Sequence, residues 1–137
     1  MLGTYQYALD AKGRVFVPAK LREELGDIIY VSKGIDNCLF VYGASEWSKI
    51  EEKLAAMPVS RARYLQRSLF PSAARFELDA QGRILLPQAL REHAGLAKDV
   101  AIVGVGNRAE IWSLDGWTRY NEQADDKLAE AMDELGF

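Results

Sequence analysis

The chain contains an internal repeat, and this repeat constrains its fold more than any other feature. Residues 9–26 read LDAKGRVFVPAKLREELG and residues 78–95 read LDAQGRILLPQALREHAG, with ten of 18 positions identical at an offset of 69. The similarity continues at an offset of 70, where Gly34 matches Gly104. Solenoid folds need three or more repeats to bury a continuous core. Two copies therefore predict a pseudo-two-fold pair, like a homodimer joined into one chain.

Each copy has the pattern of four short strands with a helix between the second and the third. Alternating apolar and polar residues indicate the first strand, and a turn with a glycine follows it. A proline and a glycine bound the short helix expected at residues 19–25. The strands are expected at 5–9, 15–17, 28–32 and 38–42 in the first copy, and at 74–78, 84–87, 100–105 and 108–112 in the second.

Further helices are expected between and after the copies. Ser45 can cap a helix that ends at Pro58, and residues 60–69 predict a connecting helix bounded by Pro58 and Pro71. A last helix begins near residue 115. The chain is therefore divided into a first repeat, a helical basic connector, a second repeat and an acidic C-terminal helix, at residues 5–47, 48–75, 76–119 and 120–137.

A single copy is too small to be stable alone. Below ~70–80 residues one core rarely supplies more than ~3–5 kcal/mol, and the edge strands of an isolated copy would stay unpaired. Pairing the two copies into one barrel solves both problems. We therefore expect the strands of the copies to interleave rather than to form two separate units.

The composition excludes several classes of protein. No apolar run approaches the ~18 residues that span a bilayer, and the first residues lack the basic and apolar regions of a secretory signal peptide. Cys38 is the only cysteine and His93 the only histidine, which excludes an internal disulfide framework, a multi-histidine metal site and a cysteine-rich zinc cluster. No Ser-His-Asp set is recognised either. We expect no metal, cofactor, membrane or small-molecule substrate, and a reducing cytoplasmic compartment.

A glycine-rich stretch, Gly104 to Ala109, matches the pattern G-x-G-x-x-A. A dinucleotide site requires that this turn open a helix. Here the following residues, Glu110 to Trp112, continue as a strand, so nucleotide binding is not predicted. The sequence shows no other phosphate-binding loop, and we do not expect an enzyme.

Charge is distributed unevenly along the chain. The net charge is −3, yet residues 58–75 contain four arginines and no acid, while residues 121–137 contain six acids and one base. A local basic patch, rather than the total, decides whether phosphate can dock, so a nucleic-acid partner stays open. The connector arginines Arg61, Arg63 and Arg67 form either a solvated or intersubunit face or a second DNA-facing patch.

The strongest candidate binding residues are Arg14 and Arg83, which each follow a turn glycine at the start of a strand, Gly13 and Gly82. An arginine at such a place can contact phosphate or read a guanine edge with two hydrogen bonds. The alternative is an ion pair between Asp10 and Arg14 that only stabilises the hairpin.

Three further basic residues are weaker candidates. Lys12 lies beside the turn glycine and is expected to be exposed and to contact phosphate, but the second copy has Gln81 at this place. Arg22 and Arg91 occupy matching positions in the short helices, and each is followed by an acid. They are either phosphate contacts or part of a solvated helix face.

These residues also carry a family resemblance. Residues 9–26 are similar to the AbrB-type swapped-hairpin motif of bacterial transition-state regulators. Two copies, together with Gly3, the segment Cys38–Val41 and a tryptophan in the following helix, resemble the MraZ family from about Gly3 to Trp117. The resemblance implies an α+β, mainly β fold: a double-psi or swapped-hairpin AbrB-like barrel built from two internal repeats, with helices between and after them.

The resemblance also implies a function. MraZ proteins are sequence-specific DNA-binding transcriptional regulators of the cell-division and cell-wall gene cluster, including their own gene, and they assemble into rings. The implied DNA contacts are the arginines of the two D-x-x-G-R motifs, Asp10 to Arg14 and Asp79 to Arg83. We expect a cytoplasmic, nucleoid-associated protein that binds tandem direct repeats in a promoter. The alternative is an antitoxin-like swapped-hairpin module that binds another protein, although antitoxins usually have one motif and a long disordered tail.

Overall fold

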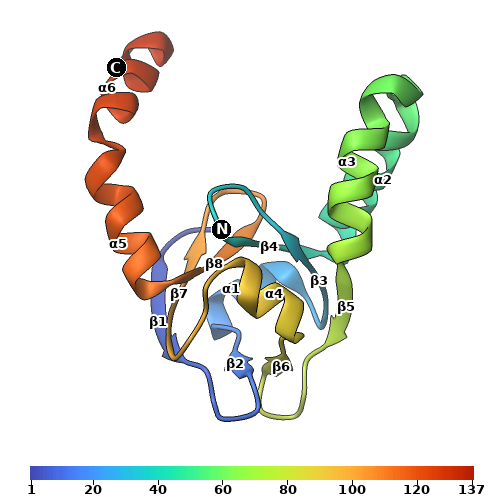
Figure 1. Cartoon of the computed structure of the whole chain (residues 1–137), viewed down its shortest axis with the longest axis vertical. Helices are drawn as coiled ribbons and strands as arrows, with labels where there is room; N and C mark the ends of the chain where they lie inside the picture. Colours follow the sequence, from blue (N-terminus) through green and yellow to red (C-terminus); the bar gives the residue numbers. More distant parts are fainter.

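The computed structural model describes residues 1–137 and has an α+β fold in which the order β-β-α-β-β-α occurs twice (Figure 1). The first copy comprises β1 (Thr4–Ala8), β2 (Arg14–Phe16), α1 (Ala19–Leu25), β3 (Ile28–Lys33), β4 (Leu39–Gly43) and α2 (Ala44–Ala56). The connecting helix is α3 (Val59–Ser72). The second copy comprises β5 (Ala74–Glu77), β6 (Arg83–Leu85), α4 (Gln88–His93), β7 (Asp99–Gly104), β8 (Ala109–Ser113) and α5 (Leu114–Gln123), and α6 (Asp125–Leu135) ends the chain. The predicted fold class is confirmed.

The strands of the two copies interleave, as expected from the size of one copy. An antiparallel sheet of six strands has the order β1-β7-β8-β4-β3-β5, and β2 pairs with β6 in a separate two-stranded ribbon. The pairs β1–β7, β3–β5, β4–β8 and β2–β6 each join one copy to the other. The sheet does not close into a barrel: β1 and β5 stay at its two edges, and from each of them the chain continues into the ribbon. The swapped-hairpin expectation therefore holds in an open form.

The core lies between the sheet, the ribbon and the two short helices. Its main cluster contains 17 buried residues from both copies, among them Val15 and Ile84 of the ribbon and Leu21 and Leu90 of α1 and α4. Cys38 is fully buried in a smaller cluster with Trp112. Because the ribbon contributes to the main cluster, its position is held by the packing of the whole domain.

The other helices form two arms. In Figure 1, α2 and α3 rise on one side of the sheet and α5 and α6 on the other, while the ribbon lies at the opposite end of the molecule. None of the helices combines the length and the hydropathy that crossing a membrane requires.

Three predicted helix boundaries were wrong. Ser45 does not cap α2, because this helix starts directly after β4 with Gly43 at its N-cap. Helix α3 continues through Pro71, since this proline lies in the last turn, where the backbone N–H of the C-cap residue, Ala73, still donates to the carbonyl of Leu69 (3.0 Å). The last helix is divided at Ala124, where two aspartates begin α6, a position in which acidic side chains are favoured.

Candidate nucleic-acid interface

The ribbon presents one face to the core and the other to solvent. Val15 and Ile84 lie opposite each other in the antiparallel register and are both buried. Side chains alternate between the faces of a strand, so the neighbours of this pair point outward. The outward face carries one arginine and one apolar side chain from each copy: Arg14, Phe16, Arg83 and Leu85. The two motif arginines therefore lie on the same surface, related by the pseudo-two-fold axis.

The aspartate of each motif organises the turn and orients its arginine. Asp10 Oδ1 accepts hydrogen bonds from the backbone N–H groups of Lys12 and Arg14, both at 2.9 Å, and its Oδ2 accepts one from Arg14 Nε at 2.6 Å. The ion pair that the sequence left as an alternative is therefore present. It uses Nε, and the two terminal nitrogens of the Arg14 guanidinium are not part of this hydrogen bond.

The second motif has the same geometry. Asp79 accepts from the backbone N–H groups of Gln81 and Arg83 at 2.9 Å, and from Arg83 Nε at 2.9 Å. Arg83 Nη1 also lies 3.9 Å from Asp10 Oδ2, which links the two turns. Both arginines are thus held in matching orientations at the end of the ribbon.

These contacts favour the charged form of both aspartates. The backbone N–H of Arg14 is the main cause that lowers the pKa of Asp10 from its ordinary 3.8 to about 2. The backbone N–H of Arg83 likewise lowers the pKa of Asp79. Both carboxylates are therefore ionised at neutral pH and hold their arginines.

Each turn glycine is required by its conformation and by its neighbour in the other copy. Gly13 and Gly82 have φ values of +88° and +79°, a region that other residues rarely adopt. A Cβ on Gly13 would lie 2.9 Å from Arg91 Cζ, and a Cβ on Gly82 would lie 2.5 Å from Arg22 Nη1. The helix arginine of one copy therefore packs against the turn of the other.

Arg22 and Arg91 consequently do not lie on a freely solvated helix face. Both residues are partly buried, and Arg91 Nε donates to the carbonyl of Leu86 at 3.0 Å. Arg22 Nε is buried and has no hydrogen-bond partner. The structure brings these two arginines to the same end of the molecule as Arg14 and Arg83.

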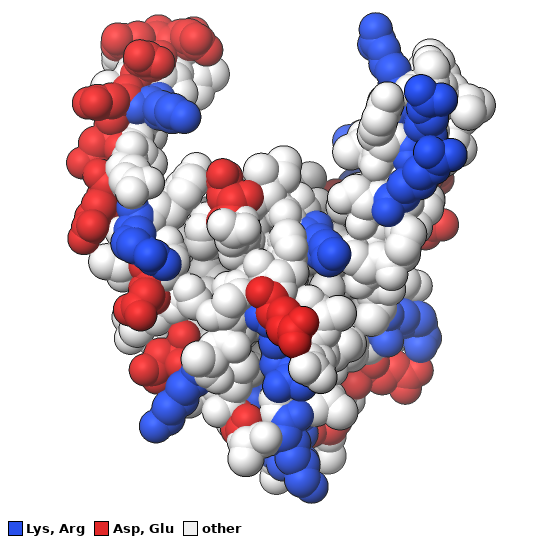
Figure 2. All heavy atoms as spheres, viewed as in Figure 1, with Lys and Arg blue, Asp and Glu red and all other residues white.

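The remaining basic candidates are divided between two regions. Lys12 is exposed at the tip of the first turn, where the second copy has Gln81. The connector arginines Arg61, Arg63 and Arg67 are exposed on α3, in the arm away from the ribbon. Figure 2 shows basic side chains along this arm and acidic side chains along the α5–α6 arm. The connector arginines therefore do not extend the surface of the ribbon.

Sequence reasoning missed two residues of this face. Phe16 is 43% exposed and Leu85 is 54% exposed, both beside the motif arginines. The alternation of the strand could have identified Phe16, because side chains alternate between the two faces of a strand and Val15 and Val17, on either side of Phe16, are buried.

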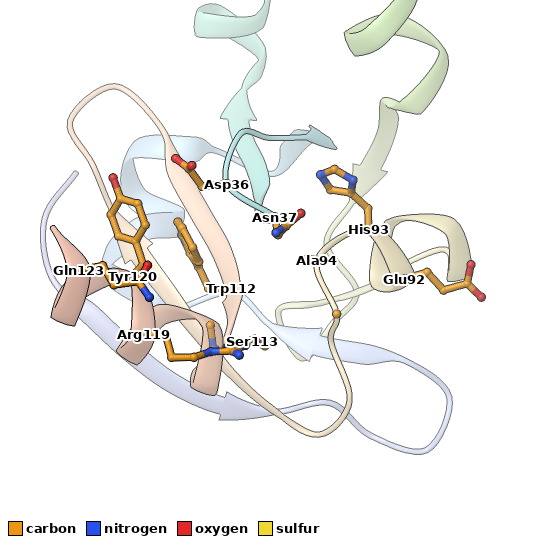
Figure 3. A pocket seen from close by; sticks show the side chains of 12 residues that line it. Asp36, Asn37, Glu92, His93, Ala94, Trp112, Ser113, Arg119, Tyr120 and Gln123 are labelled. Carbon is orange, nitrogen blue, oxygen red and sulfur yellow. Dashed lines mark hydrogen bonds between the residues drawn. The ribbon is translucent and has the colours of Figure 1, made fainter.

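A polar cavity of about 540 Å³ lies between the two copies, lined by the β3–β4 turn of the first copy and by α4 and α5 of the second (Figure 3). Asp36, His93 and Tyr120 are among its lining residues, and His93 Nε2 lies 3.2 Å from the carbonyl oxygen of Gly34. In the first copy Gly43 occupies the place of Ser113, and a Cβ there would lie 2.5 Å from the carbonyl oxygen of Leu25. The backbones of Gly43 and Leu25 therefore approach closely in the first copy, and a serine at position 43, as at Ser113 in the second copy, would prevent this approach.

Two interleaved copies that each place a D-x-x-G-R turn on a shared ribbon define a double swapped-hairpin protein of the AbrB-like type. The sequence pattern of one known family, described as "MraZ protein, putative antitoxin-like", matches residues 1–67 and again residues 69–135. The chain belongs to the MraZ family.

Relatives in this family are similar over nearly their whole length. A protein of Heliobacterium modesticaldum is 52% identical over 136 residues, which cover 98% of this chain and 95% of the relative. One of Syntrophomonas wolfei is 50% identical over 140 residues, covering 98% of both chains. One of Symbiobacterium thermophilum is 49% identical over 138 residues, covering 99% of this chain and all of the relative. Each is named "Transcriptional regulator MraZ". This chain is accordingly a transcriptional regulator and not an enzyme.

Proposed function

We propose that the chain binds double-stranded DNA in a sequence-specific way through the outward face of the β2–β6 ribbon. The observation that carries the proposal is the pair of arginines, Arg14 and Arg83, each oriented by an aspartate on the same exposed surface. The family of transcriptional regulators supports the choice of DNA as the partner.

The shape and the chemistry of the ribbon suit the major groove. This groove is about 12 Å wide and admits a two-stranded β-ribbon, and an arginine can donate two hydrogen bonds to O6 and N7 of guanine. In this proposal Arg14 and Arg83 read bases, and Lys12 contacts a phosphate. Arg22 and Arg91 support the turns from the opposite copy and add positive charge at the same end.

The proposed target follows from the family resemblance. We infer that the protein acts in the nucleoid on the promoter of the cell-division and cell-wall gene cluster, including its own gene. The test measures binding to fluorescent fragments from upstream of this gene at two salt concentrations. Specific binding exceeds binding to a shuffled fragment at both concentrations, and equal binding to the two fragments contradicts the proposal.

We further propose that copies of the chain assemble head to tail into a ring. The acidic helix α6 exposes Leu128, Met132 and Leu135, and the basic helix α3 exposes Tyr64 and Leu65. These two arms have opposite charge and lie on opposite sides of the molecule (Figure 2), which favours a heterologous contact between one arm of each copy and the other arm of the next. Light scattering at low micromolar concentration is expected to give a multiple of the 15.3 kDa chain mass, and a monomer mass contradicts the ring.

A ring predicts the arrangement of the operator. Successive subunits are related by rotation in one direction, so they favour short direct repeats spaced by about one helical turn, roughly 10–10.5 bp. Bending ~20–30 bp costs on the order of 1–6 kcal/mol, so affinity must increase steeply with repeat number to offset this cost. Duplexes with one to four repeats, with and without an insertion of about 5 bp, test this arrangement. Equal affinity for one and three repeats contradicts it.

The family description also favours a second candidate function, because it contains the words "antitoxin-like". In that case the chain would bind and neutralise another protein. Helices α5 and α6 form the end of this chain, where antitoxins usually have a disordered tail. A transcription assay separates the two functions. Regulation of the promoter by the purified chain alone supports DNA binding, and regulation only in the presence of a second protein supports the alternative.

A further inference from the structure

The outward face of the ribbon pairs each arginine with an apolar side chain of the other copy. In the antiparallel register Phe16 lies opposite Arg83, and Leu85 lies opposite Arg14. Single exposed apolar residues are common and need no explanation. Here two of them occupy the small surface between the arginines that we propose to enter the major groove.

The ring of Phe16 is held by its neighbours. Its centroid lies 6.1 Å from that of Tyr7, and Arg83 Cζ lies 5.9 Å from the Phe16 centroid. No aromatic contact of this kind involves Leu85, which is also the more exposed of the two. An apolar group that is already ordered loses little conformational entropy when it binds, so Phe16 is the better contact residue.

The major groove offers one apolar group to such a side chain, the C5-methyl group of thymine. Residues that face each other across a strand pair have Cβ atoms about 4.5–5.5 Å apart, and successive bases of one strand rise by 3.4 Å. Phe16 and Arg83 can therefore contact neighbouring base pairs at the same time. A guanine read by the arginine then places the aromatic ring against the edge of the adjacent pair.

We propose that Phe16 is a specificity-determining residue that contacts a thymine methyl group next to the guanine read by Arg83. Leu85 makes the corresponding, weaker contact beside Arg14. This inference rests on the proposed function, because it requires the ribbon to enter the major groove. It predicts that the two copies differ in sequence preference, with a stronger preference for thymine at the base pair that Phe16 contacts.

The test removes single methyl groups from the DNA. The probe is a duplex from upstream of the chain's own gene that the intact protein binds, with each thymine replaced in turn by deoxyuridine. At one position per site, affinity is expected to fall about fourfold, the factor that burying one methylene-sized group supplies. The Phe16→Ala variant is expected to bind the thymine duplex more weakly and to lose its sensitivity to deoxyuridine at that position. The Phe16→Leu variant is expected to keep part of the sensitivity to deoxyuridine.

Ile35→Ala is the matched control, because Ile35 is an exposed apolar residue on the β3–β4 turn, away from the ribbon. Its sensitivity to deoxyuridine is expected to equal that of the intact protein. The thermal unfolding midpoint of each variant checks that the fold is kept. We expect it to stay close to that of the intact protein, because both residues are exposed.

The outcomes separate this inference from the proposed function. If the protein binds no upstream duplex specifically, the proposed function fails. If it binds specifically, but every deoxyuridine duplex binds as tightly as the unmodified thymine duplex, the thymine contact is overturned and the proposed function stands. A Phe16→Ala variant that keeps the full deoxyuridine sensitivity also overturns it. A Phe16→Ala variant whose affinity falls by the same factor for the thymine and deoxyuridine duplexes, and which no longer bends the DNA, overturns it as well. That result indicates a side chain wedged between bases.

Discussion

The two copies have the same turn at the candidate interface but present different side chains around it. Asp, Gly and Arg recur at each D-x-x-G-R turn, with nearly the same hydrogen bonds. Lys12 at the first turn tip corresponds to Gln81, and Phe16 on the ribbon corresponds to Leu85. The groups that build the turn and the motif arginines are thus shared, while the side chains at the turn tip and beside the arginines differ. A duplicated chain can read two neighbouring sites unequally, which an exact homodimer cannot do.

A second difference lies where β4 and β8 meet at the pseudo-two-fold axis. Phe40 and Glu110 are equivalent positions and face each other in the register. Buried Glu110 accepts from Arg108 Nη2 at 2.8 Å and from Trp112 Nε1 at 3.1 Å. Arg108 Cζ in turn lies 4.1 Å from the centroid of the Phe40 ring. In an exact homodimer this glutamate would face its own copy, and two buried like charges repel each other. The fused chain avoids this by placing the charge on one side only.

Loss of both motif arginines is expected to have the largest effect. Each well-placed bidentate contact contributes about 1–3 kcal/mol, so Arg14→Ala with Arg83→Ala should abolish specific binding while folding and assembly remain. Each lost phosphate contact would also reduce the slope of log affinity against log salt by ~0.9. Anisotropy titrations at several salt concentrations measure both. Arg119→Ala on α5 is the control, and an unchanged affinity and slope in the double variant would show that the site is wrong.

Removal of Glu110 tests the difference between β4 and β8. Glu110→Ala leaves the indole N–H of Trp112 without its acceptor and Arg108 without its ion pair, which should lower the free energy of unfolding by about 1–3 kcal/mol. Urea denaturation measures the change. Glu46→Ala on α2 removes an exposed ion pair with Lys49 and should change stability by less than ~1 kcal/mol. Similar values for the two variants would contradict the structural role of Glu110.

The turn glycines test the contacts between the copies. Gly13→Ala and Gly82→Ala should each destabilise the fold by about 1–2 kcal/mol, because both positions are left-handed. We expect the larger effect at Gly82, where the added Cβ would lie closer to the opposite arginine. Combining Gly82→Ala with Arg22→Ala should remove the steric part of the cost and keep the conformational part. Additive losses in thermal unfolding would rule out that contact.

Exchange of the turn-tip residues is expected to have a smaller effect. Lys12→Gln removes one proposed phosphate contact and Gln81→Lys adds one, so the salt slope should fall by ~0.9 in the first variant and rise by ~0.9 in the second. The ratio of affinities for specific and shuffled DNA should stay constant, because phosphate contacts carry no direct sequence information. A changed ratio would assign a base contact to this position.

The smallest effect concerns the stability of the fold in acid, where Asp10 becomes protonated. A carboxyl whose folded pKa is lowered stabilises the fold above its unfolded pKa, and this contribution is lost as pH falls through the folded value. For Asp10 the loss occurs between about pH 4 and pH 2. Asp10→Asn should therefore have a flatter dependence of unfolding on pH in this window. Carboxyl titration by NMR measures the pKa directly, and an ordinary value near 3.8 would contradict the hydrogen-bonded turn.

Local features of the sequence determined much of this protein. The strands, the short helices bounded by proline and glycine, and the aspartate–arginine turns all follow from residues within a few positions of each other, and the repeat shows each of them twice. Backbone preferences and side-chain alternation act over such short distances, which is why Asp10 and Arg14 could be predicted together as parts of one turn. The expected interleaving followed from the burial that one short copy cannot achieve alone.

The tertiary structure alone decided which distant groups meet. Arg22 packs against Gly82, 60 positions further along the chain, and Phe16 lies opposite Arg83 in the ribbon. It also decided that β1 and β5 stay at the edges of an open sheet and that α3 continues through Pro71. These outcomes depend on strand register and on the packing of both copies around one core. Such packing is a property of the whole chain, and no short segment encodes it.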